Sequence, residues 1–121
     1  MEEVIQRLLN DVDLQNLTGG QIRRFGDLPL GKGLVYEFNS ITSNGVVAND
    51  RLTITAVSYS INDSINILDR VKKILITIGD TPFSQSVKKI VQNGGGSAKN
   101  AVNGKEMFHF TAIFYITRRE N

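Results

Sequence analysis

The chain has 121 residues, 40% of them hydrophobic and 21% charged, a composition that favours one folded domain over a disordered chain. Its 14 basic and 12 acidic side chains leave a net charge of +2, too small an excess to indicate a dedicated DNA-binding domain. It has no cysteine and a single histidine, His109, which excludes disulfides, thiol catalysis and Cys- or His-rich metal sites.

The N-terminal segment, residues 2–15, predicts an amphipathic helix that ends before Gly19-Gly20. Its apolar stripe, expected to face the core, consists of Val4, Ile5, Leu8, Leu9 and Val12. The acidic start of the chain lacks the basic and apolar regions of a signal peptide, and no apolar stretch is long enough to span a membrane. We therefore expect an intracellular protein.

Two alternating segments, LVYEFNSIT (34–42) and RLTITAVSYS (51–60), predict an antiparallel hairpin, preceded by a short strand at residues 22–25. The turn formers of residues 43–50, Asn44-Gly45 above all, predict a loop of moderate length between them. A second helix is expected over residues 63–78. The candidates for its N-cap are Asn62, Asp63 and Ser64. Its expected buried stripe consists of Ile65, Leu68, Val71, Leu75 and Ile78.

The C-terminal third predicts a lysine-bearing edge strand at 86–92 and a strong strand at 106–118. One face of the second strand is apolar and comprises Phe108, Phe110, Ala112, Phe114 and Ile116. Residues 93–105, NGGGSAKNAVNGK, have almost no apolar content and predict a loop far longer than a hairpin needs. This loop could be a flexible connection, a segment that orders on a partner chain, or a small-anion site.

The element order α-β-β-β-α-β-β indicates the α+β class, with a mainly antiparallel sheet of about four to five strands and two helices on one face. We expect a single domain, 1–121, with mobile loops at about 43–50 and 93–105.

The stretch GDLPLGKG, residues 26–33, matches a phosphate-binding loop except at its last position, where Gly33 replaces the Ser or Thr whose hydroxyl binds the metal. It runs into a predicted strand rather than a helix, and Pro29 removes one backbone donor. We interpret it as a turn. His109 has no predicted catalytic partner, and the basic pairs are scattered along the chain. We therefore expect no enzyme activity, no cofactor and no metal.

The layout resembles that of the tail-completion proteins (tail-terminator or tail-to-head joining proteins) of long-tailed bacteriophages and prophages. MEEVIQRLLNDVDLQNLTGGQI resembles the opening helix and turn of that family, and FGDLPLGKGLVYEFNS its Pro/Gly-rich turn and aromatic strand. RLTITAVSYSINDSINILDRVKKIL resembles its strand followed by a helix, and EMFHFTAIFYITRRE its closing strand. Lys32-Gly33 departs from the family, which often has a second proline there.

The resemblance implies a structural virion protein, made in the bacterial host cytoplasm and located in the tail or neck. It would cap the tail tube and join tail to head, as a hexameric ring that is a monomer in isolation. Its partners would be the tail tube protein and the head connector or head-completion protein, with no membrane and no nucleic-acid contact beyond DNA passage through the ring. The alternatives are a head-side minor capsid or head-closure component of the same phage module, and a small nucleic-acid-binding protein.

The two predicted loops are the expected contacts with a neighbouring subunit or the tube. The residues assigned to this interface are Asn44, Gly45, Val46, Val47, Asn93, Gly94, Gly95, Gly96, Ser97, Lys99 and Asn100.

Overall fold

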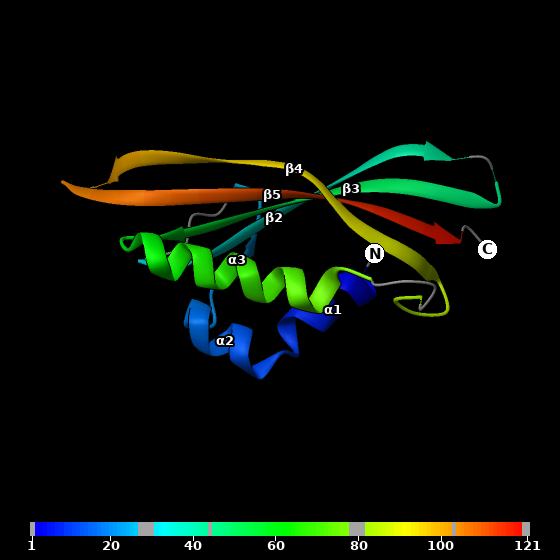
Figure 1. Ribbon diagram of the computed structural model, residues 1–121, viewed down its shortest axis with the longest axis horizontal. Coiled ribbons are helices and arrows are strands. Elements are labelled where there is room, and N and C mark those ends of the chain that lie inside the picture. Colours follow the sequence, from blue (N-terminus) through cyan, green and yellow to red (C-terminus); the bar gives the residue numbers. More distant parts are fainter. Residues whose placement is uncertain (1, 27–30, 44, 78–81, 103, 120–121) are drawn as a thin grey trace.

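A five-stranded sheet covered on one face by three helices forms the described part of the chain (Figure 1). The structure is a computed structural model, and it describes residues 2–26, 31–43, 45–77, 82–102 and 104–119. The order of elements confirms the α+β class, and all three helices lie on the same side of the sheet (Figure 1). The expected N-terminal helix is divided in two.

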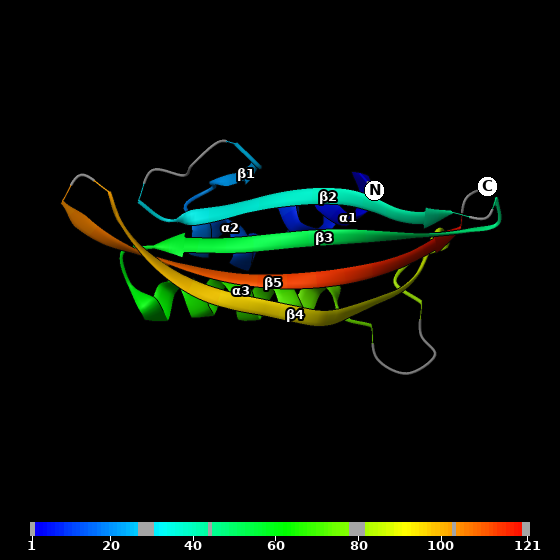
Figure 2. The ribbon, with the colours of Figure 1, turned by 90° about the horizontal axis from the view of Figure 1, so that it is seen from above.

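The sheet has the strand order β1-β2-β3-β5-β4. Its strands are β1 (Ile22–Arg24), β2 (Gly33–Ser43), β3 (Val47–Ser58), β4 (Val87–Val102) and β5 (Lys105–Arg119). All neighbours pair antiparallel except β1, which runs parallel to β2 (Figure 2). Because Gly33 begins β2, the chain enters a strand directly after Lys32, in agreement with a turn; residues 27–30 lie outside the described residues.

The N-terminal helices are α1 (Glu2–Leu9) and α2 (Val12–Thr18). Val4, Ile5 and Leu8 are buried as expected, but Val12 is 71% exposed. The reason is a new N-cap, because the Asp11 side chain accepts a hydrogen bond from the Leu14 backbone N–H and starts a second helix at this point.

Helix α3 (Ile61–Leu75) lies roughly along the strands, beneath β3 and β5 (Figure 1). It starts two residues earlier than expected because Ser60, not one of the three predicted residues, is the N-cap. Its buried face also differs, since Ile67 is buried and Ile65 is exposed, while Ile78 lies outside the described residues. Ser64 is buried on this face, where its hydroxyl donates to the Phe108 carbonyl at 2.9 Å.

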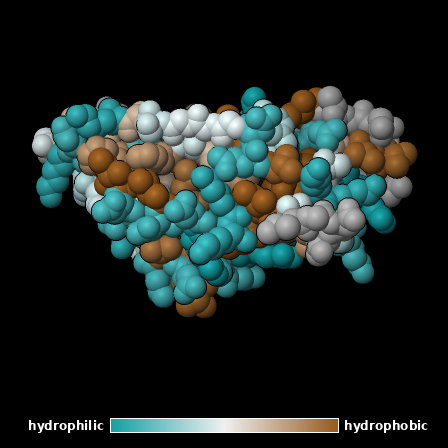
Figure 3. Space-filling view, in the orientation of Figure 1, coloured by the Kyte–Doolittle hydropathy of each residue, from teal (hydrophilic) through white to brown (hydrophobic). Residues whose placement is uncertain are grey.

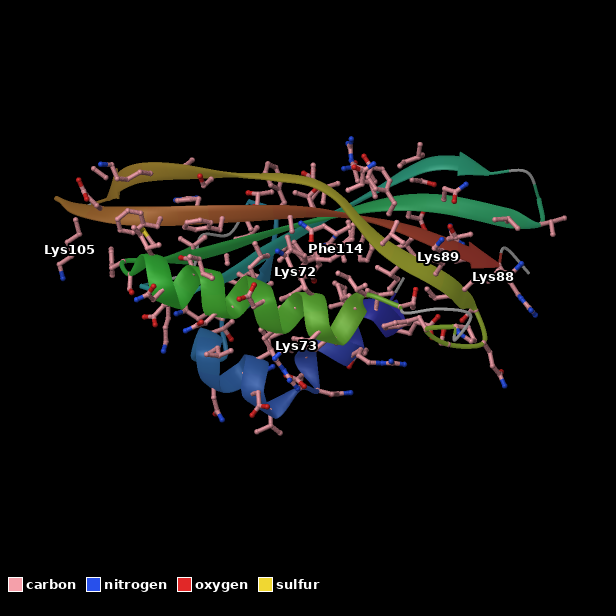
Figure 4. All side chains as sticks on the ribbon, in the orientation of Figure 1. Lys72, Lys73, Lys88, Lys89, Lys105 and Phe114 are labelled. Carbon is pink, nitrogen blue, oxygen red and sulfur yellow. The ribbon has the colours of Figure 1, made fainter. Side chains whose placement is uncertain are left out.

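The core lies between the helices and β3 and β5. Phe114, fully buried, is placed between the sheet and α3 (Figure 4). Ala112 and Ile116 are also fully buried on the same face of β5, which confirms the apolar face predicted for the C-terminal strand.

The prediction of a loop at 93–105 is wrong. Residues 93–102 continue β4 and pair with β5 as far as the pair Val102 and Lys105. A β-bulge between Gln92 and Gly95 takes up the glycines, with Gly94 at φ 111°. A long neighbouring strand therefore overrides the low strand propensity of this segment.

The loop expected at 43–50 is also too long. Val47 already begins β3, and its pairing with β2 extends to Ser43 and Ala48. The connection is shorter than predicted, and Gly45 in it has a φ of 86°, which glycine adopts readily in a turn between two strands. Asn44 lies outside the described residues.

An ion pair joins α2 to α3. The Arg70 guanidinium donates to both Asp11 carboxylate oxygens, at 2.8 and 2.6 Å. These bonds, together with the one from the Leu14 N–H, hold the pKa of Asp11 below its ordinary value.

A lowered pKa contributes stability above the ordinary carboxyl pKa, and this stability is lost as the pH falls through the value in the folded protein. We therefore expect wild type to exceed Asp11→Asn in free energy of unfolding by about 1 kcal/mol at pH 6, and the difference to shrink below about pH 4. Urea titrations across this range measure it. Asp13→Asn is the matched control, because Asp13 lies 3.6 Å from Arg70 and is mostly exposed. A difference that does not vary with pH would contradict this role of Asp11.

The bulge in β4 gives a second prediction. A Cβ on Gly95 would lie 2.5 Å from the Thr111 carbonyl oxygen, whereas one on Gly96 would meet nothing within 4 Å. Gly95→Ala should therefore lower the free energy of unfolding by about 1–3 kcal/mol, and Gly96→Ala should change it by less than about 0.5 kcal/mol. Equal effects in urea denaturation would show that the bulge does not have this geometry.

Candidate assembly surface

The predicted interface residues fall into two groups at opposite ends of the sheet. Gly45, Val46 and Val47 lie at the β2–β3 turn, and residues 93–100 lie in the half of β4 that leads to the β4–β5 turn (Figure 1). The fold therefore does not bring the two groups together within one copy.

The β2–β3 end projects beyond the helices (Figure 1). Val46 and Ile41 are 63% and 48% exposed there, which is unusual for such side chains on one short hairpin. On the helix side of this arm, the buried Asp50 carboxylate accepts from Arg118 Nε at 2.5 Å, which joins β3 to β5. The arm is thus fixed internally but leaves apolar side chains in solvent.

The second half of β4 is an exposed edge strand. Residues 92–99 are all exposed, and no described strand pairs with their outer side. Backbone groups of a strand point alternately to its two sides, and Gly96 and Ala98 lie opposite Thr111 and His109 of β5. When the alternation is followed strand by strand from β1 to β4, the backbone groups of Gly96 and Ala98 point toward β5. Those of Gly95, Ser97 and Lys99 therefore point away from β5, to the open side.

A groove of about 500 Å³ runs beside this edge, between β4 and α3. Leu68 and Lys72 of α3, Phe110 and Thr111 of β5, and residues 92–97 of β4 line it. In Figure 3, apolar surface shows below the pale strip of β4.

A second free edge lies on the opposite side of the sheet, along β2. Strand β1 is only three residues long, and its last contact is the Phe25 N–H, which donates to the Tyr36 carbonyl at 2.8 Å. Beyond Tyr36, no strand of the described chain pairs with the outer edge of β2. The edge from Phe38 to Ser43 is therefore unpaired by any described strand.

A groove of about 680 Å³ lies below this β2 edge, between it and α1. Its apolar lining comes from Ile5, Leu9, Tyr36, Phe38 and Phe25. Phe25 is 73% exposed, the largest exposure of any aromatic side chain described. The sequence did not predict that Phe25 is exposed while Phe38 is only partly buried, because an alternating strand does not show where its neighbour ends.

The first half of β4 is closed to a partner strand. Thr77, just after α3, donates from its backbone N–H to the Ile90 carbonyl at 3.1 Å, and its hydroxyl oxygen accepts from the Ile90 N–H at 3.2 Å. The free part of this edge therefore begins after Ile90.

The other face of the sheet is not covered by any described helix (Figures 1 and 2). It carries mixed side chains, and the hydroxyls of Thr55 and Thr111 meet across the strands at 3.1 Å. His109 lies on this face opposite Val57, and its buried Nε2 has no hydrogen-bond partner among the described residues.

Positive charge is dispersed over the molecule. Lys88 and Lys89 lie at one end of β4, Lys105 at the opposite tip, and Lys72 and Lys73 on α3 (Figure 4). The structure therefore forms no single basic stripe from these lysines. Within the described ranges, no group of three or more His, Cys, Asp or Glu side chains could hold a metal ion. None of the described helices has the length and apolar composition needed to cross a membrane.

The comparison with known proteins gives a match of fold. No protein family model matches the sequence, and no curated protein matches it. A chain in a solved structure of the virion of a native gene transfer agent (GTA) particle is similar, with a TM-score of 0.71 and 15% sequence identity. The match covers 96% of this chain and 91% of that one, so the two share the arrangement of helices and strands over nearly their full lengths.

Proposed function

We propose that this chain is a structural virion protein that caps the tail tube and joins the tail to the head. The observation that carries the proposal is the shared fold with a chain of a gene transfer agent virion over nearly the whole of both chains. The resemblance of the sequence to tail-completion proteins gives the more specific role at the tail end.

The surface of the molecule supports a role in assembly rather than chemistry. Two unpaired strand edges, each with a groove beside it, lie on opposite sides of the sheet. An edge of this kind is a template for pairing with another chain. Surfaces on opposite sides of one subunit suit a head-to-tail contact, which closes into a ring when the rotation between copies allows it.

In the proposed role, copies assemble as a hexameric ring on the end of the tail tube and offer the opposite surface to the head connector. The two arms of the sheet, at the β2–β3 and β4–β5 turns, extend beyond the helices and contact the tube and the connector. The interface residues at Gly45–Val47 and Asn93–Asn100 belong to these arms. DNA passes through the ring without a specific contact.

A head-side component of the same phage module is the second candidate. The similar chain belongs to a virion, which includes head-side proteins as well as tail proteins. The two roles predict different products when the gene is lost.

The test is deletion of the gene in the phage or prophage that carries it, followed by electron microscopy of the lysate. Loss of a tail terminator should give tails longer than normal and heads without tails. Loss of a head-closure protein should instead give tails of normal length and heads that have lost their DNA. Tails of normal length joined to full heads would contradict both roles.

A further inference from the structure

We propose that copies of this chain join through their strand edges. The outer edge of β2 at Phe38–Ser43 of one copy would pair, as an antiparallel strand, with the outer edge of β4 at Gly94–Val102 of the next. Only the closure of the copies into a ring rests on the proposed function. The contact between the two edges is argued from the structure of one subunit.

The two edges are free over limited stretches only. Strand β1 occupies the β2 edge up to Tyr36, and Thr77 occupies the β4 edge at Ile90. Both stretches are long enough for a short ladder of main-chain hydrogen bonds. A second copy is the occupant that the topology favours, because the same molecule presents two free edges whose strands run in opposite directions.

The two edges carry side chains of different size. The β2 edge carries Phe38, with Phe25 exposed next to it, whereas the β4 edge carries Gly94, Gly95 and Gly96. An antiparallel ladder with Ser40 opposite Ser97 sets Phe38 opposite Lys99 and the glycines opposite the end of β2 that leads to Ser43. The glycines allow the backbones to approach closely.

The strand directions agree with this pairing. Strands β2, β3, β5 and β4 each run antiparallel to the next, so β4 runs opposite to β2. A copy rotated about an axis near the strand direction therefore presents its β2 antiparallel to β4. Antiparallel addition to a sheet edge is a common mode of protein recognition.

The register across the sheet shows that the free stretches are offset. Following the pairs through β3 and β5, Ser40 of β2 lies level with Ile90, and Gly95 lies level with Tyr36. Pairing without offset would set the β2 edge against the stretch that Thr77 blocks. The two blocked stretches therefore force an offset. Ser97 lies level with Leu34, so a ladder with Ser40 opposite Ser97 is offset by about six residues, or roughly 20 Å at ~3.3 Å per residue.

An offset of this size suits a closed ring. The sheet has five strands, about 24 Å wide at ~4.8 Å per strand. An offset of roughly 20 Å over that width inclines the strands to the ring axis by about 40°, which lies within the tilt of closed sheets, ~35–45°. A ladder this short gives a weak contact between two copies, so we expect a monomer at low concentration.

Disulfide trapping tests the pairing, and the absence of cysteine in the chain makes every crosslink attributable. Ser40 and Ser97 are both exposed and both point to the helix side of the sheet. Within one copy they lie roughly 25 Å apart by strand spacing and rise, far beyond disulfide range. Ser40→Cys combined with Ser97→Cys, oxidised at high protein concentration, should therefore give a ladder of covalent dimers, trimers and higher multimers.

Control variants separate this arrangement from others. Ser40→Cys combined with Ala101→Cys shifts one thiol by four residues, about 13 Å along the strand, and should crosslink about tenfold more slowly. Efficient dimers from Ser97→Cys alone would show a two-fold β4–β4 contact, and the absence of multimers from the main pair would show that the edges do not meet. Either result would overturn the proposal.

The outcome is distinct from that of the gene deletion. Overlong tails without the disulfide ladder would leave the tail role in place and reject the edge pairing. A ladder without a tail defect would support the pairing and reject the tail role.

Discussion

The difference in length between strands and helices determines the shape of this molecule. Strand β5 and helix α3 each have 15 residues. A strand of that size extends about 50 Å, whereas a helix extends about 22 Å. The helices therefore cover only the middle of the sheet, and both ends project beyond them (Figure 1). The two arms at the ends of the sheet follow from this mismatch.

The open edges are restricted as well as exposed. Strand β1 covers the beginning of the β2 edge, and Thr77 covers the beginning of the β4 edge. Natural sheets commonly protect their edges against unintended pairing in such ways. Here the protection leaves one free stretch on each side, at different levels of the sheet. Partial coverage thus limits which register a partner strand can take.

The glycine segment of β4 connects the local backbone to the proposed assembly. Gly94 and Gly95 form the bulge that keeps the strand paired with β5. The same residues line the groove that lies between β4 and α3. A segment that looks like a flexible connection in the sequence is thus an ordered edge with a specific shape.

The sequence by itself determined the class of the fold, the β2–β3 pairing and the apolar face of β5, because periodicity reports directly which side of an element is buried. It did not show the division of the N-terminal helix, although Asp11 at a cap position was a signal for it. Strand pairing across the chain decided the rest. Residues 93–102 form a strand because β5 lies alongside, and Phe25 is exposed because β1 ends at Arg24. Such contacts join residues far apart in the chain, so no local pattern encodes them.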